Sequence, residues 1–164
     1  MKALYVLRHG IAEARGENPD DAARELTRKG KDRMKLIAKG LYNAGIPCDA
    51  ILTSPLVRAL QTARIARKYC WEKADIEVTD LLKPDALFDE LIDHLNGLEG
   101  VDNVAIVGHE PFLSGFVSYC LAGDRLSFVR LKKGGVASLE IDEAIKPGQC
   151  ALLRLMEPDQ LIRL

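Results

Sequence analysis

The chain has 164 residues, enough for a sizeable core, and we expect one domain over residues 1–164. Lysine and arginine total 23 and aspartate and glutamate total 24, so the net charge of −1 gives no overall reason to expect nucleic acid or an anionic membrane as a partner. Apolar residues make up 48% of the chain and charged residues 29%, as in ordinary soluble proteins.

No targeting or membrane segment is predicted. The apolar stretch at residues 3–7 is too short for the core of a signal peptide, Arg8 interrupts it, and no later stretch approaches the length of a membrane span. We therefore expect the cytoplasm. The cysteines lack a C-x-x-C pair and a matching histidine cluster, which predicts reduced structural thiols rather than disulfides or zinc ligands. They are Cys48, Cys70, Cys120 and Cys150.

Strand-like and helix-like segments alternate in the first half of the chain. Residues 2–7 are short and apolar and predict a buried strand, whereas residues 12–25 are polar and predict a long loop. Thr27 can cap a helix that runs to about residue 44. A second strand is expected at residues 49–53, after which Ser54 and Pro55 predict the cap and first position of a helix to about residue 69.

The second half continues the alternation. A short strand at residues 76–79 precedes an amphipathic helix at 85–98 with Leu87 on its apolar side, and the β-branched strand at 104–107 ends at Gly108. Pro111 opens a helix that is apolar nearly all round. Two last strands are expected at 136–141 and 151–156, separated by a turn at Pro147-Gly148. The sequence therefore predicts an α/β fold: a single three-layer domain with a mostly parallel central sheet flanked by helices.

Cationic or potentially cationic side chains follow three of these strands. Arg8 and His9 follow the first, Arg58 lies one helical turn beyond the second, and His109 follows the strand at 104–107. Ligands of parallel sheets gather beyond the carboxyl ends of the strands. Two like charges about 4 Å apart repel by roughly 4 kcal/mol under an effective dielectric near 20. An anion is therefore the expected partner, and phosphate fits best.

Arg58 and Thr62 strengthen this hypothesis. The start of a helix disfavours a cation but attracts anions, and an arginine placed there can grip two phosphate oxygens. Thr62, one turn further on, could donate a hydrogen bond into the same site. The structural alternatives are a plain strand end for Arg8-His9, a surface ion pair for Arg58 and a helix cap for His109. His94 falls on the polar side of its helix and is expected to be a solvated surface residue.

Read together, these motifs resemble the histidine phosphatase superfamily, which has the phosphoglycerate mutase-like fold. Arg8-His9-Gly10 resembles its R-H-G signature, and residues 54–62 resemble its S-P-x-x-R-A-x-Q-T segment. Residues 26–30 are similar to its L-T-x-x-G helix start, and Gly108-His109 to its late G-H pair. The small size leaves no room for a large helical cap, so the chain is most similar to SixA-type phosphohistidine phosphatases.

The resemblance implies a mechanism and roles. Neutral His9 would attack phosphorus and become phosphorylated, with Arg8, Arg58 and His109 around the phosphate oxygens, and water would then release inorganic phosphate. It implies no metal ion and no cofactor. Asp80 occupies roughly the place of the general acid in the superfamily. Glu110 and Asp85 are alternatives, and Asp85 is more simply explained as a surface or capping carboxylate.

Three functions fit these residues. The SixA-type resemblance implies phosphohistidine in a protein as substrate, whose imidazole leaving group depends less on an enzyme acid. A phosphatase of the same superfamily acting on a small phosphate ester would need a firm general acid. A non-catalytic phosphate-binding regulatory module is the third, and the presence of His9 and His109 beside both arginines argues against it. None of the three involves nucleic acid or a membrane.

Overall fold

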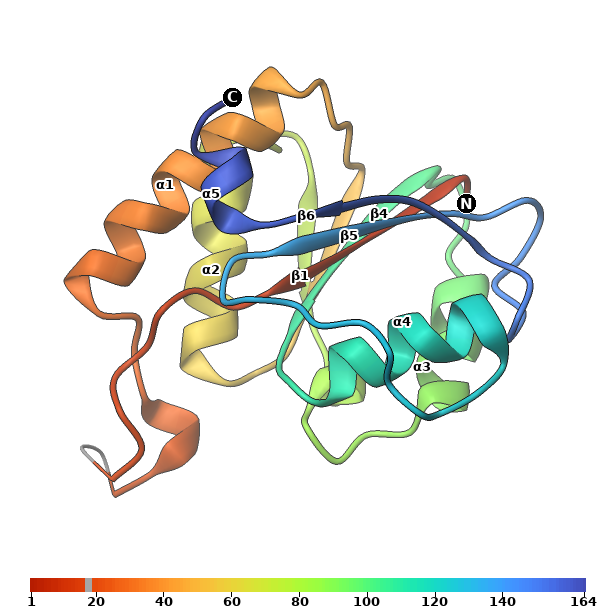
Figure 1. The fold of residues 1–164 in the computed structure, drawn as a ribbon, viewed down its shortest axis with the longest axis horizontal. Coiled ribbons are helices and arrows are strands. Elements are labelled where there is room, and N and C mark those ends of the chain that lie inside the picture. The colour runs from red at the N-terminus through yellow and green to blue at the C-terminus, as the bar shows by residue number, and fades with distance from the viewer. Residues whose placement is uncertain (17–18) are drawn as a thin grey trace.

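A six-stranded sheet forms the centre of the computed structural model, which describes residues 1–16 and 19–164 (Figure 1). Its strand order is β3-β2-β4-β1-β5-β6. The strands are β1 (Ala3–Arg8), β2 (Ala50–Thr53), β3 (Asp75–Val78), β4 (Asn103–Gly108), β5 (Val136–Glu140) and β6 (Ala151–Met156). The first four are parallel, β5 runs antiparallel to β1, and β6 runs antiparallel to β5. The predicted α/β class with a mostly parallel sheet is confirmed.

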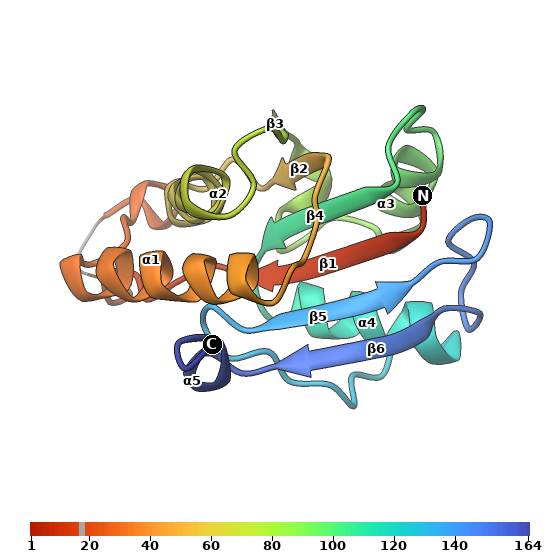
Figure 2. The same cartoon turned by 90° about the horizontal axis from the view of Figure 1, so that it is seen from above.

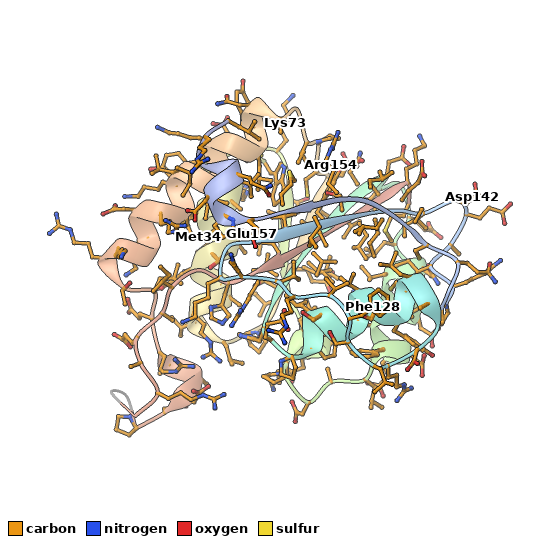
Figure 3. All side chains as sticks on the ribbon, in the orientation of Figure 1. Met34, Lys73, Phe128, Asp142, Arg154 and Glu157 are labelled. Carbon is orange, nitrogen blue, oxygen red and sulfur yellow. The ribbon has the colours of Figure 1, made fainter. Side chains whose placement is uncertain are left out.

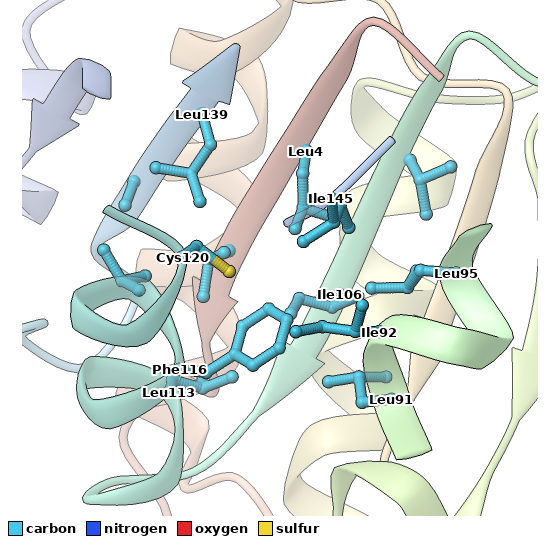
Figure 4. Close-up of a cluster of buried hydrophobic side chains, with 14 of the residues drawn as sticks. Leu4, Leu91, Ile92, Leu95, Ile106, Leu113, Phe116, Cys120, Leu139 and Ile145 are labelled. Atoms are coloured by element: carbon cyan, nitrogen blue, oxygen red, sulfur yellow. The ribbon is translucent and has the colours of Figure 1, made fainter. Parts of the chain in front are cut away.

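Helices cover both faces of this sheet (Figures 1 and 2). They are α1 (Arg28–Asn43), α2 (Val57–Tyr69), α3 (Phe88–Asn96), α4 (Phe112–Ala122) and the short α5 (Pro158–Leu161), with 3₁₀ turns η1 (Asp21–Ala23) and η2 (Asp80–Leu82). Side chains alternate along β1, so Leu4 and Val6 pack against α3 and α4, while Tyr5 and Leu7 face α1 and α2. Figure 4 shows the first of these two cores, and together they make the three layers expected.

Local signals located most element boundaries. The Thr27 hydroxyl accepts a hydrogen bond from the Gly30 amide at 3.0 Å and caps α1 as predicted, and Gly45 follows its end with a φ of +66°. The polar loop at 12–25 contains η1 and a bridge between Ala12 and Leu26. Residues 17 and 18 of that loop lie outside the described residues.

Two predicted helix starts were wrong. The chain stays non-helical through Ser54 and Pro55, and α2 begins at Val57 after Leu56, whose side chain cannot cap it. The Ser54 hydroxyl instead contacts the Leu56 amide at 3.3 Å and His109 at 2.8 Å. Helix α3 begins at Phe88 rather than residue 85, since the Ala86 amide closes a turn on the Lys83 carbonyl at 3.2 Å and Leu87 is extended. Leu87 therefore precedes α3 and is 55% exposed, instead of lying on its buried side.

Among the described residues, no helix is both long enough and apolar enough to span a membrane. All four cysteines are free thiols, as expected. Cys120 is buried in α4 and the other three are partly buried.

Gly30 shows why the start of α1 needs a glycine. A Cβ there would lie 1.9 Å from the carbonyl oxygen of Ile11, because α1 docks directly on the chain that leaves the first strand. That contact also fixes the chain just after His9, since the Thr27 amide donates to the same carbonyl at 3.0 Å.

We expect Gly30→Ala to lower the free energy of unfolding by about 1–3 kcal/mol, the usual cost of overpacking. Gly97→Ala is the matched control, because a Cβ on Gly97 meets nothing closer than 3.4 Å and its φ is −80°. Urea unfolding of both variants measures the difference. Equal stabilities for the two would contradict the tight docking of α1.

Candidate active site

A cavity of about 520 Å³ lies beyond the carboxyl ends of the central strands. It brings together Arg8, His9, Arg58 and His109, the four residues that the strand-end pattern singled out. The parallel register explains the meeting, because Arg8 at the end of β1 pairs with Gly108 at the end of β4. The His9 and His109 rings are neighbours, with centroids 5.1 Å apart and planes tilted by 52°.

His9 is buried and held in one orientation. Its Nδ1 lies 2.7 Å from the carbonyl oxygen of Gly10, and because a carbonyl only accepts, Nδ1 carries the proton. Nε2 is therefore the nitrogen with the free lone pair. Burial lowers the pKa of His9 to about 3, against the opposing Gly10 hydrogen bond and with help from the charges of Arg58 and Arg8. The ring is thus neutral and equipped as a nucleophile at neutral pH.

His109 faces His9 from the end of β4. Its Nε2 lies 2.8 Å from the Ser54 hydroxyl, and its buried Nδ1 has no hydrogen-bond partner among the described residues. Burial, followed by the effect of His9 and Arg58, lowers the pKa of His109 to about 3. A buried polar atom without a partner is costly, so Nδ1 marks a place for a ligand atom.

Both arginines are anchored to backbone carbonyls at the edge of the cavity. Arg8 Nη1 donates to the Leu131 carbonyl at 2.7 Å, and Arg58 Nη1 donates to the Asp21 carbonyl at 2.7 Å. Arg58 Nη2 also pairs with the Asp21 carboxylate at 3.0 Å. The Nε atoms of both arginines are buried and have no partner in the part of the chain that the structure describes. Burial lowers the pKa of each guanidinium, while Glu110 opposes this at Arg8 and Asp21 opposes it at Arg58.

Several lining residues were not found by sequence reasoning. The loop at 12–25 contributes Asp21, whose carboxylate bridges Arg58 and Arg24, and Arg24 in turn donates to the Glu13 carbonyl at 2.6 Å. The full lining is Arg8, His9, Ala12, Glu13, Ala14, Arg15, Asp21, Arg24, Arg58, Pro84, His109, Glu110, Pro111 and Lys133. The polar composition of the loop signalled a functional segment, but no local pattern says where such a loop docks.

Thr62 supports the site from behind. Its hydroxyl donates to the Arg58 carbonyl at 2.8 Å and accepts from the Gly10 amide at 3.0 Å, so its one proton is already used. Thr62 is fully buried and absent from the cavity lining. The direct hydrogen bond to phosphate that we expected is therefore not formed, and Thr62 instead ties the His9 segment to α2.

The structure does not bring Asp80 into the cavity. Asp80 follows β3 as expected, but its side chain, at the start of η2, is 75% exposed and pairs with Lys83 at 2.9 Å. Asp85 is also absent from the lining. Glu110 does line the cavity, and its carboxylate accepts from the Ser114 hydroxyl at 2.6 Å. His94 is half-buried and lies 2.9 Å from the Glu77 carboxylate, so it is less solvated than expected.

The lining is rich in positive charge. Its cationic side chains are Arg8, Arg15, Arg24, Arg58 and Lys133, and its acidic ones are Glu13, Asp21 and Glu110. Within the described residues, no three His, Cys, Asp or Glu side chains are grouped so as to hold a metal ion. A neutral imidazole nitrogen between two guanidinium groups suits attack on a phosphoryl group, whose oxygens need positive charge in the transition state.

Comparison with known proteins agrees with this geometry. The family model of the histidine phosphatase superfamily (branch 1) matches residues 4–83, a span that contains Arg8, His9 and Arg58. An uncharacterized protein of Picosynechococcus is 34% identical over 142 residues, which cover 83% of each chain. The chain belongs to the histidine phosphatase superfamily.

Two further comparisons show that this histidine phosphatase is similar to SixA in sequence and in structure. Phosphohistidine phosphatase SixA of Escherichia coli is 27% identical over 143 residues, covering 86% of each chain. A solved structure of the protein histidine phosphatase SixA complexed with tungstate is 26% identical, with a TM-score of 0.86 over 97% of this chain and 99% of that one. The fold is thus the phosphoglycerate mutase-like fold of the SixA proteins, and membership of the superfamily supports phosphatase activity.

The buried neutral histidines make the stability depend on pH. In the unfolded chain each titrates near 6.5, whereas in the fold the pKa is about 3, so the unfolded state binds more protons below pH 6.5 and stability falls as the pH falls. From pH 7.5 to pH 5, each histidine should cost about 2 kcal/mol of unfolding free energy.

Urea unfolding of wild type and His9→Asn at the two pH values measures this, because carboxylate contributions common to both proteins cancel in the difference. We expect the variant to lose about 2 kcal/mol less than wild type between pH 7.5 and 5. An equal loss in both proteins would show that His9 is not held neutral by burial.

Proposed function

We propose that this histidine phosphatase hydrolyses phosphohistidine in proteins through a phosphohistidine intermediate on His9, and that it needs no metal ion. The observation that carries the proposal is the state of His9. The ring is neutral, its Nδ1–H donates to the Gly10 carbonyl, and the lone pair on Nε2 is left for attack on phosphorus. Arg8, Arg58 and His109 stand around it with unpartnered buried nitrogens. We also propose that the enzyme acts in the cytoplasm, where its four free thiols stay reduced.

In the first chemical step, the Nε2 lone pair of His9 attacks phosphorus in line. The bond from phosphorus to the substrate nitrogen breaks and its electron pair returns to the leaving ring, which departs as neutral imidazole because its other ring nitrogen already carries a proton. The phosphoryl oxygens gain their stabilisation from the guanidinium groups of Arg8 and Arg58 and from His109. The cationic groups thereby supply the charge that a divalent ion supplies in other phosphatases.

In the second step, water attacks phosphorus and the bond to Nε2 of His9 breaks. Of the two water protons, one stays on the oxygen that now bonds phosphorus and the other passes to a phosphoryl oxygen or to solvent, so inorganic phosphate leaves and the neutral imidazole of His9 is restored. Gly10 keeps the proton on Nδ1 in both steps, so the same nitrogen is the nucleophile and then the leaving group.

The protein substrate is supported by the construction of the cavity. Its lining residues come from strand ends, loops, the 3₁₀ turn η1 and the first turns of helices, and the described residues form no large helical cap over them. Asp80 lies outside the cavity, and an imidazole leaving group depends less on an enzyme acid than an alcohol does. The likeness to SixA points the same way.

A small phosphate ester is the second candidate substrate. The observation that favours it is Glu110, a carboxylate inside the cavity that could protonate an alkoxide leaving group. The two candidates share the His9 mechanism and differ in the need for this acid.

Removal of His9 tests the proposed chemistry. We expect wild type to release phosphate from a phosphohistidine-bearing protein in excess EDTA, and His9→Ala to lose at least about 10⁴-fold in turnover, as other enzymes do without their nucleophile. Phosphate release measured in EDTA with and without added magnesium decides the question. Turnover that stops in EDTA and returns with magnesium would overturn the metal-independent mechanism, and phosphate-induced thermal stabilisation without any turnover would indicate a binding module.

Glu110→Gln, with Asp80→Asn as the matched control, tests the leaving group. We expect Glu110→Gln to reduce turnover of phosphate monoesters by about 10²-fold, the contribution of a general acid, with less than about threefold change on phosphohistidine. Asp80→Asn should leave turnover of both substrates unchanged, because Asp80 lies outside the cavity. A loss on phosphohistidine with Asp80→Asn as severe as with His9→Ala would refute this assignment.

A further inference from the structure

A second cavity of about 630 Å³ adjoins the first and shares Arg8 and Glu110 with it. Its other lining residues are Ser114, Ser127, Val129, Arg130, Leu131, Lys132 and Glu157. Most of them belong to the segment at residues 124–133, which connects α4 to β5 and which we call the α4–β5 segment. The proposed mechanism uses no residue of this segment.

The α4–β5 segment exposes apolar side chains although its backbone is anchored. Phe128 is 64% exposed and Leu126 is 76% exposed, whereas Val129 and Leu131 are buried in the core. The Phe128 amide donates to the Ser118 hydroxyl of α4 at 3.2 Å. Figure 3 shows Phe128 on the side of the molecule that carries α4. Two exposed apolar side chains on an anchored segment indicate a surface used for contact.

This surface is joined directly to the catalytic site. The Leu131 carbonyl accepts the hydrogen bond from Arg8 at 2.7 Å, and three residues of extended chain span at most about 10 Å, so Phe128 lies within that reach of Leu131. A standard protein interface covers about 800 Å² on each partner, a patch with a radius of roughly 16 Å. A protein whose phosphohistidine reaches His9 would therefore also cover Phe128.

The charges define the partner further. Arg130 extends the positive charge of the catalytic cavity along the second one, where Lys132 pairs with Glu157 at 2.8 Å, and cationic side chains outnumber acidic ones by seven to four over the two linings. The whole chain has a net charge of −1, so this excess is local. Complementary charge requires acidic side chains on the partner around its phosphohistidine.

We propose that the α4–β5 segment is the docking surface for the phosphoprotein substrate, with Phe128 and Leu126 contacting an apolar patch beside the phosphohistidine and Arg130 facing acidic side chains. This inference rests on the proposed function, because it names the surface that selects the protein substrate of the same site. The cavity holds the phosphoryl group, and the segment supplies the contacts that a free phosphorylated imidazole cannot make.

The test compares a protein substrate with a small one. The probes are a helical histidine-containing phosphotransfer domain phosphorylated with phosphoramidate, and free phosphoimidazole. For Phe128→Ala and for Arg130→Glu we expect kcat/KM on the protein to fall about tenfold or more, as for central interface residues, through a higher KM. Turnover of phosphoimidazole should stay within twofold of wild type, which also shows that the variants are folded.

Tyr42→Ala is the control, because Tyr42 is an aromatic residue 67% exposed near the end of α1, close to the amino end of β2 at the opposite edge of the sheet. Tyr42→Ala should leave the turnover of both the phosphorylated domain and phosphoimidazole unchanged. If wild type hydrolyses the phosphorylated domain and Phe128→Ala and Arg130→Glu do so equally well, the docking surface is refuted and the proposed function stands. If wild type hydrolyses phosphoimidazole but not the domain, both the protein substrate and its docking surface are refuted.

Discussion

The site depends on one electrostatic constraint: two guanidinium groups and two imidazoles are gathered at the edge of the sheet, and the buried Nε of each arginine and Nδ1 of His109 have no partner among the described residues. The fold satisfies the constraint by keeping both imidazoles neutral through burial. Asp21 compensates Arg58 only from the rim of the cavity, and the inner nitrogens remain without partners. A phosphoryl group supplies the missing negative charge and the missing acceptors together. That match makes the arrangement suitable for a phosphatase and costly for a site without a ligand.

Both histidines of the candidate site are held by residues that do not line the cavity. Thr62 fixes Gly10, which in turn fixes the His9 tautomer, and Ser54 holds the His109 ring. These contacts connect β1, α2 and β4, so the precision of the site comes from the packing of the parallel strands and not from its loops. The loop at 12–25 and the α4–β5 segment then border the cavity and adjust Arg58 and Arg8.

The sequence predicted what depends on local pattern. Strands, most helix bounds and the convergence of Arg8, His9, Arg58 and His109 followed from hydrophobic periodicity and from the rule that parallel strands end at one edge. Ser54 was misread as a helix cap because a serine before a proline has that local signature, whereas its hydroxyl is used by His109 far along the chain. The sequence could not predict where three other side chains lie, namely Asp80, Asp21 and Phe128. Their positions depend on how loops dock, and loop docking depends on tertiary contacts that no local spacing encodes.

The central claim is that phosphate passes through Nε2 of His9. The most direct measurement is rapid acid-free quenching of wild type mixed with a phosphohistidine-bearing protein in EDTA, followed by mapping of the phosphorylated residue by mass spectrometry at alkaline pH. The account predicts a transient phosphoryl group on His9 that is lost in acid, and none in His9→Ala. Steady release of phosphate with no phosphorylated His9, or with the label on another residue, would contradict it.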